Sequence, residues 1–278
     1  MSLLAVVTAL AAEQAFGNWR DDARPGVIAP LYRFCRFRSA VVATTMVVVV
    51  AVLAGYAVAS IHDALLAALA SALILFICLG PRDIASEVNA LLAARANGET
   101  AAAERIVRTL HRGPEPEADH RSLLGALFIQ SHERVFGVLF WFIACGPGGA
   151  VAYRLASRLP TLLDADSPAL RGTETLHAVL AWLPVRATAL LFAFAGSMDD
   201  ALAAWYRLRI EPHPDWRQHT WSVLAETATA SIDIDGGEGP AMPVSLETCF
   251  REIVRMQNRA LLILLAANAL LAAGATFA

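Results

Sequence analysis

Long uninterrupted apolar runs constrain the fold of this chain more than any other feature. Residues 39–59 and 64–80 contain no charged side chain, and a helix of about 20 such residues spans the hydrocarbon core of a bilayer. Lipid offers the backbone no hydrogen-bond partner, so only helices and closed barrels cross it. The apolar residues are continuous rather than alternating, which favours helices. The sequence therefore predicts an all-α, polytopic membrane protein.

Three further apolar runs complete the predicted set of spans. They cover residues 135–153, 176–196 and 260–277. A shorter apolar helix over residues 3–16 lacks the basic start of a signal peptide and contains Glu13, so we expect the mature protein to retain it. The prediction is about five transmembrane helices plus this short N-terminal membrane helix, in a single integral membrane domain over residues 1–278.

Arginine placement indicates the topology. All 22 basic residues are arginines and the net charge is −3, which is too small to suggest a nucleic-acid partner. Arginines gather in residues 17–38, 81–134 and 198–259, and the positive-inside rule places such segments in the cytoplasm. We interpret 81–134 and 198–259 as cytoplasmic helical segments between spans that cross alternately. The lipid bilayer is then the principal partner of a multi-pass protein.

Several kinds of chemistry find no support in the sequence. The absence of lysine excludes a P-loop lysine and a lysine Schiff base. The four cysteines show neither CxxC nor Cys/His ligand spacing; they are Cys35, Cys78, Cys145 and Cys249. We therefore predict no metal site, no disulfide framework and no assigned cofactor.

Arg186 is the most informative single residue, because it lies near the middle of the predicted span 176–196. An arginine at that depth costs about 2.5 to 3.5 kcal/mol on insertion scales. One interpretation is a structural ion pair inside the bundle, with Glu13 as its partner. The other is an anion-binding site, since a planar guanidinium matches carboxylate and phosphate. Pro184 would kink the helix beside this charge, which favours a site.

The stretch HERVFGVLFWFIACGPGGAVAYRLASR, residues 132–158, places charged residues at both ends of an apolar run. In an unbroken helix Glu133 and Arg154 would lie about 30 Å apart. A break at the Gly-Pro-Gly-Gly sequence of residues 146–149 would return Arg154 to membrane depth, where it could pair with Glu133 or with a ligand. His132 and Arg134 are interpreted as flanking residues.

Five residues form the candidate ligand-binding set, and no catalytic residue is assigned. The set is Glu13, Glu133, Tyr153, Arg154 and Arg186. Its members are either ionisable groups within or beside apolar runs or, for Tyr153, an aromatic neighbour of one. The prediction that distinguishes a site from scattered charges is that the five converge on one cavity.

Three motifs resemble the AmpE family of bacterial inner-membrane proteins. They are the short N-terminal helix with Glu13, VLFWFIACGPGGAVAYRL at 138–155, and VLAWLPVRATALLFAFAG at 179–196 followed by AAWYRL at 203–208. The resemblance covers nearly the whole chain. It implies a location in the bacterial inner membrane and a regulatory role in β-lactamase induction and cell-wall recycling. It also implies a functional link to the amidase AmpD.

The chain also resembles, more distantly, the cobinamide synthases of cobalamin biosynthesis, CbiB and CobD. EQAFGN at 13–18 is similar to their D-x-x-x-G-D motif, with Asn18 replacing an aspartate. HER, AYR and LPVR, which hold Glu133, Tyr153 with Arg154, and Arg186, are similar to A-E-N, A-Y-K and L-P-A-R. The polar stretch that follows A-Y-K in those enzymes is here LASRLPTLLD. This resemblance implies an ATP-dependent amide-forming ligase, with ATP or Mg²⁺ as cofactor.

Three function classes therefore stay open. The first is a membrane regulator whose cavity binds an anionic small molecule or an amphiphile. The second is an enzyme of the cobinamide-synthase type, acting on a carboxylate near the membrane face. The third is a non-catalytic membrane scaffold whose cytoplasmic segments dock a partner protein.

Overall fold

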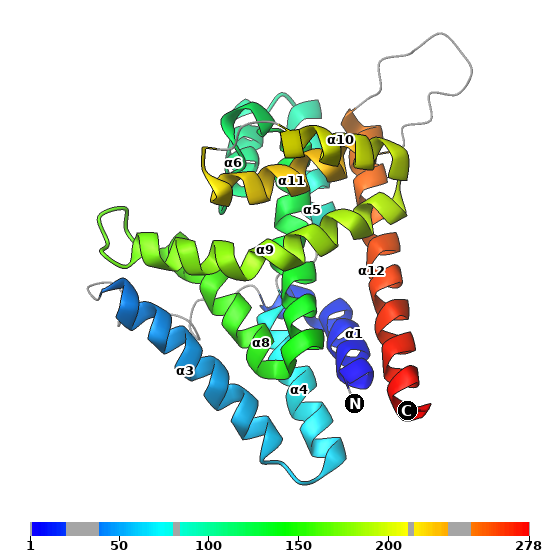
Figure 1. The fold of residues 1–278 in the computed structure, drawn as a ribbon. Helices are drawn as coiled ribbons and strands as arrows, with labels where there is room; N and C mark the ends of the chain where they lie inside the picture. Colours follow the sequence, from blue (N-terminus) through cyan, green and yellow to red (C-terminus); the bar gives the residue numbers. More distant parts are fainter. Residues whose placement is uncertain (1, 21–38, 80–83, 211–213, 233–245, 278) are drawn as a thin grey trace. The chain divides into compact units, whose positions relative to one another are not determined.

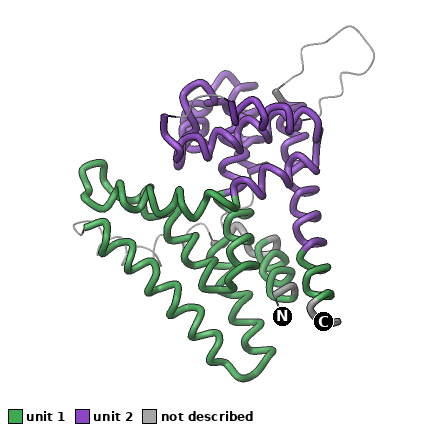
Figure 2. The backbone as a smooth tube through the Cα atoms, in the orientation of Figure 1, with its two compact units in different colours: residues 1–82, 133–184, 268–278 green, residues 83–132, 185–267 purple. Residues whose placement is uncertain are grey.

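The computed structural model describes residues 2–20, 39–79, 84–210, 214–232 and 246–277, and every regular element in these ranges is a helix (Figure 1). The prediction of an all-α fold is confirmed. Contacts between the helices divide the chain into two compact units, and each unit takes residues from distant parts of the sequence (Figure 2).

The first unit comprises residues 1–82, 133–184 and 268–278. Its helices are α1 (Ser2–Arg20), α3 (Ala40–Ala59), α4 (Ala64–Cys78), α8 (Gly137–Leu162) and the first part of α9 (Leu170–Ala195). Helices α3 and α4 form a helical hairpin. Its short turn ends at Asp63, whose side chain caps α4 by accepting a 2.8 Å hydrogen bond from the Leu66 amide. Helix α1 packs on α4, and α8 packs on both α3 and α4.

The second unit comprises residues 83–132 and 185–267. It contains the end of α9 and most of α12 (Leu246–Phe277). Its other elements are α5 (Ile84–Ala96), α6 (Thr100–Leu110), the 3-10 turn η1 (Ala118–His120), α7 (Leu123–Ser131), α10 (Met198–Ile210) and α11 (Trp216–Ala230). Helix α11 packs against both α7 and α10 and buries most of its length. In the core, the rings of Phe128 and Phe192 pack edge to face with their centroids 4.7 Å apart.

Within the described residues, four helical stretches are long and apolar enough to cross a membrane: α3, residues 123–162, α9 and residues 247–274. They support the prediction of a membrane protein. Helix α4 has 15 residues, about 22 Å at the helical rise, and is therefore shorter than a hydrocarbon core of about 30 Å. The number of crossings and the choice of the inner membrane stay predictions.

Helix α8 consists of two helical arms rather than one straight helix. Gly146 interrupts it with φ 68° and ψ −159°, and the chain folds back so that Tyr153 Oη lies 2.6 Å from Glu133 Oε1. An unbroken helix would separate these two residues by about 30 Å. The prediction of a single span over 135–153 is therefore wrong, whereas the alternative of a break at 146–149 is confirmed. Figure 1 shows the two arms.

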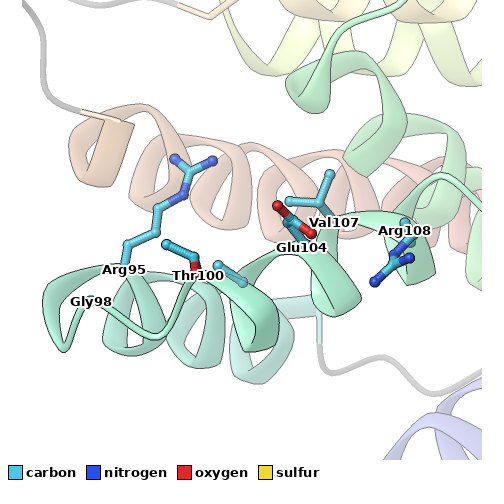
Figure 3. Close-up of a pocket in the computed structure, with 7 residues that line it drawn as sticks. Arg95, Gly98, Thr100, Glu104, Val107 and Arg108 are labelled. Atoms are coloured by element: carbon cyan, nitrogen blue, oxygen red, sulfur yellow. The ribbon is translucent and has the colours of Figure 1, made fainter.

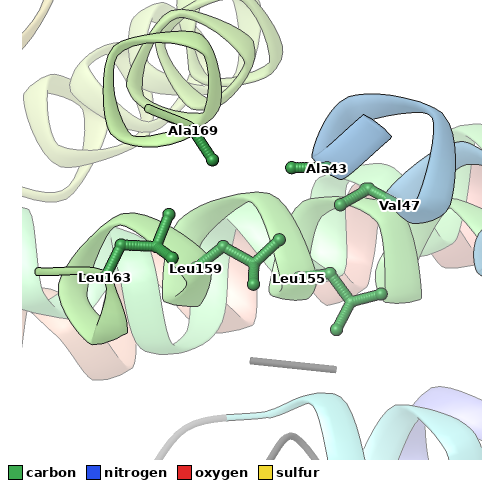
Figure 4. Close-up of a cluster of buried hydrophobic side chains, with 6 residues drawn as sticks. All are labelled: Ala43, Val47, Leu155, Leu159, Leu163 and Ala169. Atoms are coloured by element: carbon green, nitrogen blue, oxygen red, sulfur yellow. The ribbon is translucent and has the colours of Figure 1, made fainter. Parts of the chain in front are cut away.

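Small residues allow the turn of this hairpin to pack tightly on α3. A Cβ atom on Gly148 would lie 2.7 Å from the Ala51 carbonyl oxygen and 3.4 Å from Gly55 Cα, so backbone meets backbone here. Nearer the N-terminus of α3, apolar side chains pack this helix against the second arm of α8 (Figure 4). The cluster is Ala43, Val47, Leu155, Leu159, Leu163 and Ala169. The hairpin is thus held at its turn and along one arm.

Replacing Gly146 by alanine is expected to destabilise the protein by about 1 to 3 kcal/mol, because its φ and ψ fall in a region that only glycine occupies readily. The midpoint of thermal unfolding in mild detergent would measure the loss. Gly274→Ala is the matched control, since a Cβ at Gly274 meets no atom within 4 Å. Equal midpoints for the two variants would contradict the strained turn.

Candidate functional site

Glu133 begins the site, in a π-helical turn that joins α7 to α8. The turn covers His132–Phe136, where hydrogen bonds reach one residue further than in an α-helix. Single π-turns are rare and occur frequently at functional sites. Only 8% of Glu133 is exposed, so its carboxyl group is directed into protein rather than towards lipid or water.

Two side chains from other elements meet the same oxygen of Glu133. Tyr153, on the second arm of α8, donates a 2.6 Å hydrogen bond from Oη to Oε1. His177, on α9, places Nε2 3.0 Å from that oxygen. An ionised carboxylate has acceptors only, so His177 then donates through Nε2. Both partners are buried, and their rings lie 5.8 Å apart.

Three arginines lie near this contact. Arg134 and Arg154 are buried, and Arg158, one turn beyond Arg154, interacts electrostatically with both Glu133 and Arg134. We call the six residues the Glu133 cluster; they are Glu133, Arg134, Tyr153, Arg154, Arg158 and His177. The cluster contains three guanidinium groups and one carboxylate. Planar guanidinium groups bind carboxylate and phosphate with two parallel hydrogen bonds, so its chemistry suits an anion.

Comparison with protein families identifies the chain. The family model described as "Regulatory signalling modulator protein AmpE" matches residues 1–276. The chain belongs to the AmpE family. The predicted resemblance is thereby confirmed over almost the entire length, and the family supports a regulatory role at the membrane.

A curated relative confirms the more distant resemblance. The cobalamin biosynthesis protein CobD of Chromobacterium violaceum is 27% identical over 177 residues, which are 59% of this chain and 54% of that protein. The match therefore spans about half the length of this relative. No solved structure matches the AmpE-family chain.

The structure of this AmpE-family protein unites part of the predicted site. Glu133 and Tyr153 are in direct contact, and Arg154 is buried on the same arm of α8. Glu13 is buried in α1. Arg186 is half-buried on the part of α9 that belongs to the second unit. The convergence of all five residues on one cavity stays a prediction.

Neither His177 nor Arg158 is among the site residues predicted from the sequence. His177 carried a usable signal, because an ionisable side chain inside an apolar helix is a functional candidate by default. His132 and Arg134, interpreted as flanking residues, are both buried. In the second unit, His132 Nδ1 lies 2.9 Å from Thr188 Oγ1, and its ring faces Trp221 at 5.9 Å.

The structure also bears on metal binding, and it contains a surface hollow away from the site. Among the described residues, no three His, Cys, Asp or Glu side chains gather closely enough to hold a metal ion. A surface hollow of about 630 Å³ lies along α5 and α6 (Figure 3), lined by Arg95, Gly98, Thr100, Ala103, Glu104, Val107 and Arg108. It belongs to the segment 81–134, and none of the candidate site residues lines it.

Proposed function

We propose that this AmpE-family protein regulates β-lactamase induction from the bacterial inner membrane by binding an anionic ligand at the Glu133 cluster. The ligand is a small molecule or an amphiphile whose level reports on cell-wall recycling. The observation that carries the proposal is that Glu133, Arg134 and Arg154 are all buried, and that Tyr153 and His177 both contact the Glu133 carboxyl group.

The cost of burying these groups supports a binding role. Ionisable side chains inside membrane proteins are expensive and usually mark ligand or ion sites. The arginines supply charge and paired donors for an anion. Glu133 acts as a positioning residue, because its Oε1 holds both the Tyr153 hydroxyl and the His177 imidazole in place.

The hairpin offers a route from binding to signalling. Glu133 precedes the first arm of α8 and Tyr153 lies on the second, so their hydrogen bond joins the two arms. A bound anion competes with Glu133 for the Tyr153 donor and for the arginines. It therefore favours a different arrangement of the arms, and a ligand shifts a conformational equilibrium by its difference in affinity for the two states.

The regulatory proposal is tested in a host that lacks its own copy of this gene. Complementation with Arg154→Gln is expected to leave β-lactamase induction as it is in the deletion strain, because the substitution removes a buried guanidinium. Glu133→Gln is expected to act in the same direction. The measurement is β-lactamase activity against the concentration of an inducing β-lactam, with the membrane level of each variant checked by immunoblot.

Arg105→Gln is the matched control for this experiment, because Arg105 is an exposed arginine on α6. It is expected to restore wild-type induction. Repeating the comparison in a strain without AmpD tests the functional link to that amidase, since a protein acting in the same pathway should then have a smaller effect. Induction unchanged by deletion of the gene would overturn the proposal.

The similarity to CobD favours a second candidate function, an ATP-dependent amide-forming ligase. In that case the Glu133 cluster binds the carboxylate substrate, and ATP with Mg²⁺ supplies the activation that amide formation requires. The chain aligns with only about half of CobD. Growth of a cobinamide-synthase-deficient strain on expression of this chain would support the ligase, and failure despite normal membrane levels would count against it.

A further inference from the structure

Three exposed arginines form a stripe along α12. Arg251, Arg255 and Arg259 follow one another at intervals of four residues, and their side chains are 66%, 66% and 52% exposed. Residues spaced in this way share one face of a helix. The apolar run of α12 begins at the next residue, Ala260. The stripe therefore ends where the helix becomes able to enter lipid.

The carboxylates beside the stripe leave donor groups available. Glu252, only 14% exposed, accepts from Arg255 at 3.4 Å and from Arg259 at 2.9 Å. Arg251 pairs with Glu247 at 2.5 Å. Two carboxylates thus serve three guanidinium groups, each with five N–H donors. Arg255 and Arg259 converge on one carboxylate and keep a net positive charge together.

A second contact places Arg259, the last arginine of the stripe, at the end of another apolar helix. Arg259 Nη1 donates a 2.9 Å hydrogen bond to the carbonyl oxygen of Ala195, the last residue of α9. A Cβ on the next residue, Gly196, would lie 3.0 Å from Met256 Cε. The end of α9 therefore lies beside the start of the apolar run of α12, and Arg259 marks that position.

We propose that Arg251, Arg255 and Arg259 bind the phosphate group of an anionic phospholipid, such as phosphatidylglycerol or cardiolipin. The phosphates of a bilayer lie at the boundary where apolar helices leave the hydrocarbon, and basic residues beside a span attract anionic headgroups there. Guanidinium groups bind phosphate through paired, charge-assisted hydrogen bonds. The site shares no residue with the Glu133 cluster and does not depend on its function.

The full-length protein in mild detergent, titrated with phosphatidylglycerol and with phosphatidylcholine under native mass spectrometry, tests the site. Phosphatidylglycerol is expected to bind more tightly. The double variant Arg251→Gln/Arg255→Gln should weaken that preference, by about fivefold per arginine. Arg259 is left in place because it also holds Ala195. The matched control is Arg105→Gln/Arg108→Gln, which removes two exposed arginines from α6.

Equal binding of the two lipids, or an equal loss in the α12 and α6 double variants, would overturn the proposal. A competition arm separates a lipid headgroup from a soluble phosphate compound. Inorganic phosphate at millimolar concentration is expected not to displace phosphatidylglycerol, because it lacks the acyl chains that hold a lipid beside the apolar run. Displacement would assign the arginines to a soluble phosphate ligand and overturn the lipid as occupant.

Discussion

Replacing Glu133 by alanine is expected to cost the protein about 3 kcal/mol of folding stability. Removing one member of a buried charged pair costs about 3 to 5 kcal/mol in soluble proteins. Hydrogen bonds inside membrane proteins contribute less, about 0.6 kcal/mol on average, so the lower end of the range applies. The loss arises because Tyr153 and His177 both bond to the deleted carboxylate and cannot reach water.

The measurement is the free energy of unfolding in mixed micelles, together with the thermal midpoint. Glu133→Gln keeps an acceptor oxygen for Tyr153, so a smaller loss is expected and the variant stays suitable for induction experiments. Glu104→Ala, at an exposed position on α6, is the control and should leave stability within about 0.5 kcal/mol. A Glu133→Ala midpoint equal to that of this control would show that the buried contact contributes nothing.

Replacing Gly137 by valine is expected to cost about 2 to 4 kcal/mol. A Cβ atom at Gly137 would lie 2.5 Å from two carbons of the Tyr153 ring and 2.6 Å from its hydroxyl oxygen. Overpacking of this kind costs about 1 to 3 kcal/mol, and displacement of Tyr153 adds the loss of its bond to Glu133, up to about 1.7 kcal/mol. The first arm of α8 thus requires glycine at this position so that the second arm can approach.

A double-mutant cycle isolates the clash. In a Tyr153→Ala background the ring is absent, so Gly137→Val should cost much less than it does in the wild-type protein. The coupling between the two substitutions is read from unfolding free energies and should reach about 0.5 to 3 kcal/mol. Gly274→Val, at a position with open space around it, controls for valine in an apolar helix. Additive losses in the cycle would refute the contact between the arms.

Much of the helical framework could be predicted from local sequence. Uninterrupted apolar residues predict helices α3 and α4, because a membrane segment must satisfy its own backbone. The Gly-Pro-Gly-Gly sequence at 146–149 indicates the break in α8, since Gly146 adopts a conformation that other residues avoid. Glu133 and Tyr153 were selected because ionisable groups and their neighbours in apolar surroundings usually have a function.

The remainder of the site depends on contacts between distant residues. His177 lies 44 positions from Glu133, and no local pattern indicates that their side chains meet. The π-turn at His132–Phe136 changes which side chains share a face, so α-helical spacing does not predict their directions. Burial of His132 and Arg134 follows from packing between helices, which the apolar pattern of a single segment does not specify.

The fold-back of α8 also changes the side of the membrane on which the chain emerges after this helix. A single span at 135–153 would carry the chain to the other side of the membrane, whereas two antiparallel arms return it to the side from which it came. If the arginine-rich segment 198–259 is cytoplasmic, as the positive-inside rule predicts, helix α9 then makes no net crossing. Arg186 would not have to occupy the centre of the bilayer, and the cost of about 2.5 to 3.5 kcal/mol for that position would no longer apply.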